Sequence, residues 1–226
     1  MSRRVPEMAI VVGVLFASGW LAFVLLVEGD RLLREPAGIL PVVLVAAALC
    51  YPFAAWAVYF DDDPAGTFPP EPVAVVGGLL ALVPVVAGAL GGRALFGLFA
   101  GTAVALPPAG YALKYGDSLP PARASLAGGT VVGVGVVTVG LLVEQPYLAA
   151  PVALAAFLGG VAVHDRAGAP LLSATLVFGG TALVAAALVG ASVSLGHSPS
   201  VTLATALTVG FGGAVGARFL SKPSRW

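Results

Sequence analysis

Three polar groups in this apolar sequence have side chains suited to chemistry. Asp61, Asp62 and Asp63 are consecutive carboxylates, and carboxylate oxygens bind divalent cations. A second group, His164, Asp165 and Arg166, combines a general base with a side chain that binds phosphate. A third group, Thr202, Thr205 and Thr208, repeats every three residues and presents hydroxyl groups that suit the lining of a pore.

The sequence nevertheless favours a structural role for each group. Aspartates 61–63 follow an apolar segment as a hydrated turn would, and no second acidic cluster supplies the further ligands that a cation site needs. Neighbouring residues on a helix do not face each other, so residues 164–166 are expected to mark a cytoplasmic helix end. Threonines in membrane helices more often hydrogen-bond within the helical packing. We therefore predict no catalytic, cofactor-binding or metal-binding residue.

The composition is that of a membrane protein. Of the 226 residues, 59% are hydrophobic and 10% are charged, whereas a soluble domain carries about a quarter charged residues. Eleven basic residues balance eleven acidic ones, which leaves no basic excess for a nucleic acid partner. Cys50 is the single cysteine, which excludes an internal disulfide. The expected surroundings are therefore a lipid bilayer.

Eight apolar segments approach the length of about 20 residues that a helix needs to cross a membrane. Open strands cannot cross lipid, because their backbone groups would lack hydrogen-bond partners, so each segment is predicted to be a helix. Turns at residues 91–93 and 196–199 divide two runs that are too long for one crossing. The first segment resembles a signal peptide but is longer, so we expect it to be retained. The predicted spans cover residues 8–27, 39–60, 73–90, 94–113, 124–143, 147–163, 171–195 and 201–220.

These spans predict an all-α, polytopic transmembrane bundle of eight helices in four hairpins, forming one integral membrane domain over residues 1–226. With the N-terminus in the cytoplasm, eight basic residues lie inside and three lie outside, at Arg31, Arg34 and Arg93. Basic residues concentrate on the inside of the cell membrane, so both termini are predicted to be cytoplasmic. If residues 73–113 held one span and a re-entrant segment, the first two helices would be reversed.

Glycine positions predict how the helices pack. Gly129, Gly133 and Gly140 lie near one face of the fifth predicted span, and small residues allow helices in lipid to approach closely. Such glycine-rich faces predict packing within the bundle, and contact with other membrane proteins or with a second copy of the chain. Gly-Gly pairs also recur every 51 residues, which indicates either a two-helix unit repeated four times or chance recurrence among 30 glycines.

The middle of every predicted span is free of Asp, Glu, Lys and Arg. Ionisable residues at this depth usually mark proton relays, ion pathways or active sites. The favoured hypothesis is therefore a non-catalytic membrane subunit or scaffold. The alternatives are a facilitative permease or channel for a small neutral solute or lipid, and a membrane-embedded enzyme acting on a lipid or isoprenoid. The enzyme would require residues 61–63 and 164–166 to converge.

Composition also carries a resemblance. The abundant Ala, Val and Gly, the excess of arginine over lysine, the absence of asparagine and the acidic turn VYFDDDPAG resemble the uncharacterised multi-pass membrane proteins of halophilic archaea. The resemblance covers the whole chain in style and includes no motif. It implies a multi-pass membrane protein and no particular site residue.

Overall fold

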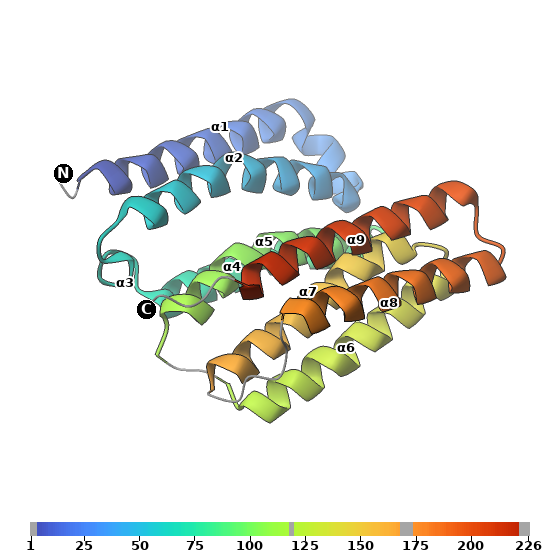
Figure 1. Ribbon diagram of the computed structural model, residues 1–226. Coiled ribbons are helices and arrows are strands. Elements are labelled where there is room, and N and C mark those ends of the chain that lie inside the picture. Colours follow the sequence, from blue (N-terminus) through green and yellow to red (C-terminus); the bar gives the residue numbers. More distant parts are fainter. Residues whose placement is uncertain (1–3, 118–119, 168–173, 222–226) are drawn as a thin grey trace. The chain divides into compact units, whose positions relative to one another are not determined.

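The computed structural model describes residues 4–117, 120–167 and 174–221, without the side chains of residues 4–6, 174–178, 181 and 212–221. All regular structure in the described residues is helical (Figure 1). The elements are α1 (Arg4–Arg34), the 3₁₀ turn η1 (Pro36–Gly38), α2 (Ile39–Phe60), α3 (Pro64–Thr67), α4 (Pro70–Leu90), α5 (Ala94–Tyr115), α6 (Ala122–Leu142), α7 (Pro146–Arg166), α8 (Ala174–Ser194) and α9 (Pro199–Ser221).

The chain divides into two compact units, Met1–Asp117 and Ser118–Trp226. In unit 1, α1 packs against α2, α4 packs against α5, and α2 also contacts α5. In unit 2, α6 packs against α7, α8 packs against α9, and α7 also contacts α9. Each long helix therefore has its neighbour in sequence as a packing partner. A single integral membrane domain over the whole chain remains a prediction.

The predicted all-α fold is confirmed, and six helices in the described part of the chain are long and apolar enough to cross a membrane. They are α1, α2 together with η1, α4, α5, α6 and α7. Within their fully described residues, helices α8 and α9 contribute shorter apolar stretches, Ala182–Ser194 and Pro199–Phe211. The predicted spans over residues 171–195 and 201–220 thus lie partly outside the described residues.

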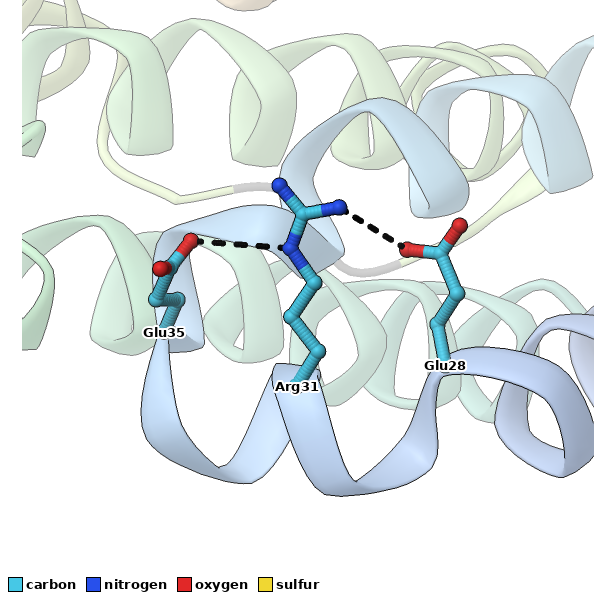
Figure 2. Close-up of polar contacts among 3 residues, drawn as sticks. All are labelled: Glu28, Arg31 and Glu35. Carbon is cyan, nitrogen blue, oxygen red and sulfur yellow. Dashed lines mark ion pairs between the residues drawn. The ribbon is translucent and has the colours of Figure 1, made fainter.

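Helix α1 is longer than predicted, because the stretch EGDRLLREP (28–36) forms two further helical turns instead of a loop. Arg31 lies 3.9 Å from the Glu28 carboxylate and 3.8 Å from the Glu35 carboxylate, at helical spacings of three and four residues (Figure 2). Such pairs favour a helix. The helix ends at Arg34 because the residue before a proline avoids the α conformation. At 31 residues, α1 is about 46 Å long.

Three hairpins, α4–α5, α6–α7 and α8–α9, repeat one geometry at an interval of 52 residues. The first helices of α4–α5 and α6–α7 begin at residues 70 and 122, and the first helices of all three hairpins end at residues 90, 142 and 194. Each turn contains one residue with a positive φ, at Gly92, Glu144 and Gly196. The following N–H donates to the carbonyl five residues earlier in each turn, at 2.7, 2.8 and 2.9 Å, which is the Schellman ending of a helix.

This repeat differs from the one that the Gly-Gly pairs predict. Its interval is 52 residues instead of 51, and the α1–α2 connection uses η1 in place of the Schellman turn. The repeat therefore covers three hairpins and not four. The turns predicted at residues 91–93 and 196–199 are both present.

Glycines allow the paired helices to touch at backbone distance. A β-carbon at Gly88 of α4 would lie 2.6 Å from the α-carbon of Gly97 in α5. On α6, β-carbons at Gly129, Gly133 and Gly140 would meet α7, at the carbonyls of residues 156 and 153 and at the Ala149 β-carbon respectively. These three glycines of α6 share the face that packs on α7.

Candidate functional site

Two of the three aspartates after α2, Asp61 and Asp63, bind the backbone of their own loop. Asp63 is the N-cap of α3, and its carboxylate accepts a hydrogen bond from the Gly66 N–H at 3.2 Å. The Asp61 carboxylate accepts from the Asp63 N–H at 3.0 Å. Such bonds are how aspartate stabilises turns and helix starts. Two of the three carboxylates thus shape the loop.

Tyr111 of α5 fastens this loop to the bundle of unit 1. Its hydroxyl lies 2.7 Å from the Pro64 carbonyl oxygen and 2.6 Å from that of Phe68, at the two ends of α3. One hydroxyl hydrogen serves both acceptors, either shared or in alternation. The loop is therefore held in place by a tyrosine that the sequence analysis did not single out.

The polar group at the end of α7 belongs to unit 2. His164 and Arg166 lie in the last turn of the helix, where basic groups interact favourably with the helix dipole. The His164 Nδ1 atom is buried and has no hydrogen-bond partner among the described residues. Asp165 and the 61–63 aspartates fall in different units, so their convergence on one site remains a hypothesis. Within the described residues, no three His, Cys, Asp or Glu side chains gather as metal ligands.

The threonines of α9 hydrogen-bond to their own helix. The hydroxyls of Thr202, Thr205 and Thr208 donate to carbonyls four residues earlier, at 3.3, 2.8 and 3.0 Å. Thr205 is fully buried. Their hydroxyl hydrogens are thus donated to the backbone of α9 and of the residue just before it, which is the behaviour of threonine in a packed helix.

Pro108 in α5 frees a carbonyl, and a tyrosine hydroxyl donates a hydrogen bond to it. Pro108 has no N–H, so the carbonyl of Val104, four residues earlier, loses its helical donor. The Tyr51 hydroxyl of α2 donates to this carbonyl, and Val104 itself is buried. The freed backbone group is therefore satisfied between two packed helices and is not directed into an open pathway.

An apolar cavity of about 430 Å³ lies among the helices of unit 2. It is lined by side chains from all four helices, including Val137, Ala150, Leu188 and Val209. Two hydroxyls also line it, those of Thr130 and Thr138, and both donate to carbonyls of α6 itself. The cavity therefore suits an apolar chain better than water or an ion.

A second cleft, of about 560 Å³, lies in unit 1 where α1 ends and the α4–α5 turn begins. Arg31, Arg34 and Arg93 line it together with Glu28 and Glu35. From the sequence alone, these three arginines indicate only the orientation of the chain in the membrane. In the predicted topology, all three arginines lie on the outer side of the membrane. This shared side is the sequence signal that could have indicated their proximity. We refer to this feature as the arginine cleft.

No protein-family model, curated protein or solved structure matches the chain. Its function must therefore be inferred from the residues and their geometry.

Proposed function

We propose that this chain is a non-catalytic, multi-pass protein of the cell membrane that acts as a subunit or scaffold. It contacts other membrane proteins, or a second copy of itself, through glycine-rich helix faces that its own packing leaves open. The observation that carries the proposal is a pair of glycine faces on α6, of which one is used within unit 2 and one is open.

The helices expose more large apolar side chains than is usual for a protein surface in water. Leu26 of α1 is 87% exposed, Leu142 of α6 is 76% exposed and Leu183 of α8 is 74% exposed. Large apolar side chains exposed in such number indicate contact with a membrane or a protein. The absence of Asp, Glu, Lys and Arg from the middle of the predicted spans supports lipid surroundings and argues against a proton or ion pathway.

The two glycine faces of α6 differ in what they meet. Gly133 is buried against the carbonyl of Ala153 in α7. Gly128 and Gly135, seven residues apart and thus on one side of the helix, are exposed, and a β-carbon at either would meet nothing within 4 Å. Because small residues drive association of helices in lipid, the open face suits a partner helix.

Adjacent glycines provide the test. In Gly128→Leu and Gly135→Leu we expect an unchanged fold and a loss of association, because only the open face is filled. In Gly129→Leu we expect loss of the α6–α7 packing, because its β-carbon would collide with the Ala156 carbonyl. The measurements are cysteine crosslinking of α6 in native membranes and circular dichroism of protein purified in detergent.

The proposal fails if the purified chain is stable and monodisperse in buffer without detergent, because lipid exposure would then be excluded. It also fails if the leucine variants at positions 128 and 135 crosslink as the unmodified chain does. An enzymatic or transport activity of the purified protein would replace the scaffold role.

A second candidate, a facilitator for a lipid or small neutral solute, is favoured by the cavity of unit 2. Its apolar lining favours the lipid over the solute, because the two threonine hydroxyls are already bonded. Val184→Trp would fill the cavity from α8. We expect it to abolish lipid exchange between proteoliposomes if this function is correct, and to leave scaffolding unchanged.

A further inference from the structure

We propose that the arginine cleft of unit 1 binds a phosphoryl anion, carried either by the headgroup of an anionic phospholipid or by free phosphate. The proposal goes beyond a scaffold role and assigns a ligand to side chains that the packing of the helices does not require. It rests on the charge that lines the cleft, on the position of Arg93, and on the contact that fixes the walls.

The cleft has an excess of positive charge. Its lining contains three arginines and two glutamates, a formal charge of +1. Both glutamates are near Arg31, at 3.8 and 3.9 Å. These distances are long, and their side chains are at least half exposed, so the pairs are weak. Arg34 and Arg93 have no ion pair within the described residues, and their guanidinium groups remain available to an anion that approaches from their side.

Helix dipoles account for the three arginines to different degrees. Arg31 and Arg34 lie in the last turn of α1, where the dipole favours a cation. Arg93 follows the C-terminal end of α4 and is also the N-cap of α5, so one dipole favours its charge and the other disfavours it. Its side chain caps no N–H of α5. The dipoles thus compensate Arg93 less than the other two, and an anion in the cleft would supply that compensation.

The walls of the cleft are held together by a tight backbone contact. A β-carbon at Gly91, in the α4–α5 turn, would lie 2.8 Å from the Ala37 nitrogen in η1. Ala37 is buried with Leu40 and Ala100 in an apolar cluster. Arg34 precedes Ala37 by three residues and Arg93 follows Gly91 by two, so the contact fixes the backbone from which both side chains extend. Guanidinium groups bind phosphate by paired, charge-assisted hydrogen bonds.

The predicted topology puts the cleft at the outer headgroup layer. Its three arginines are the basic residues that lie outside when the N-terminus is cytoplasmic, against the usual distribution. An anionic headgroup would compensate them there. This location rests on the proposed membrane insertion, whereas the anion chemistry does not.

The test compares three ligands and two sets of variants. The full-length protein in dodecyl maltoside is titrated with dioleoylphosphatidylglycerol, with dioleoylphosphatidylcholine or with inorganic phosphate. Binding is measured by native mass spectrometry and by the shift in melting temperature. The variants are Arg34→Gln with Arg93→Gln, the same pair changed to Lys, and Arg123→Gln as a matched control on α6, outside the cleft.

We expect phosphatidylglycerol to bind and to raise the melting temperature, and the double glutamine variant to bind at least about tenfold more weakly. The lysine pair should recover part of the affinity, because it restores charge without the paired geometry. Arg123→Gln should bind as the unmodified protein does. Binding of inorganic phosphate that depends on Arg34 and Arg93 would identify a free anion as the ligand.

The proposal is overturned if the double glutamine variant retains full affinity for both anions, or if phosphatidylcholine binds as tightly as phosphatidylglycerol. It is also overturned if neither anion binds. The phosphate titration needs no membrane, so it reports on the cleft even if the scaffold function is wrong.

Discussion

The α4–α5 and α6–α7 hairpins have one backbone design and different residues at its critical positions. Both first helices contain 21 residues, and both end in a Schellman turn. The positive-φ position is Gly92 in one and Glu144 in the other. At the interval of 52 residues, the prolines at 107–108 of α5 correspond to the glycines at 159–160 of α7.

Comparison of the two hairpins indicates which features set the geometry of the helix pair. At a close crossing near the turn, both hairpins have a glycine on the first helix, Gly88 or Gly140. Across from it stands Gly97 in one hairpin and Ala149 in the other. Small residues at this crossing and a left-handed residue at the turn are common to both. The positions of the internal prolines are not, since α5 has Pro107 and Pro108 whereas α7 has Pro151, so proline modifies the design and does not define it.

The largest expected effect is at the crossing itself. Gly88→Ala should lower the free energy of unfolding by about 3 kcal/mol, because its β-carbon would meet the Gly97 α-carbon at 2.6 Å and no side chain is there to yield. Gly140→Ala should also be costly, since its β-carbon would collide with that of Ala149. Unfolding in mixed micelles of detergent and SDS measures both.

A double-mutant cycle separates the two hairpins. Ala149→Gly should restore most of the stability lost in Gly140→Ala, because it removes the colliding atom. No such compensation exists for Gly88→Ala. Gly78→Ala, on the same helix with nothing within 4 Å, should not destabilise the protein. If Gly88→Ala were as harmless as Gly78→Ala, the tight crossing of α4 and α5 would be wrong.

The next effect concerns the prolines that distinguish α5 from α7. Tyr51→Phe should cost about 2 kcal/mol, because it leaves the Val104 carbonyl, freed by Pro108, buried without a donor. Tyr59→Phe is the control, since Tyr59 lies on the same helix and is 80% exposed. Equilibrium unfolding in mixed micelles measures the difference. Equal stability of the two variants would show that water or another group satisfies the carbonyl.

The sequence predicts much of this fold for physical reasons. Apolar length locates the helices, and Gly91 and Gly92 locate a turn, because one helix over residues 73–113 would be twice the thickness of the membrane core. The extension of α1 to Arg34 is not predicted from the sequence, because a charged stretch after an apolar span indicates a loop. The ion pairs of Arg31 with residues three positions before and four positions after it favour a helix instead. The arginine cleft is missed as well. It joins residues about 60 positions apart in sequence, which are brought together by long-range packing that includes η1 on α4.

A smaller effect isolates the turn from the crossing. Gly92→Ala should cost about 1.5 kcal/mol, because φ at this position is 68° and an L-residue is strained there. A β-carbon at Gly92 would meet nothing within 4 Å, so the backbone alone is tested. Thermal unfolding in detergent should show the same loss for Gly196→Ala, whose φ is 74°. A neutral result at both positions would mean that the turns adopt another conformation.

The smallest expected effect has the opposite sign. Glu144 occupies the same position with φ at 59°, so the α6–α7 turn is already strained by its side chain. Glu144→Gly relieves this strain, but glycine also raises the conformational entropy of the unfolded chain. The first effect is expected to be larger, so the free energy of unfolding should rise by about 0.5 kcal/mol. Glu144→Ala, which keeps a β-carbon, is the matched control and should gain nothing. If Glu144→Gly instead lowers the free energy of unfolding, Glu144 is not strained in the folded protein. The two turns would then share their hydrogen bonds but not a strained residue, and only the helices of the two hairpins would be equivalent.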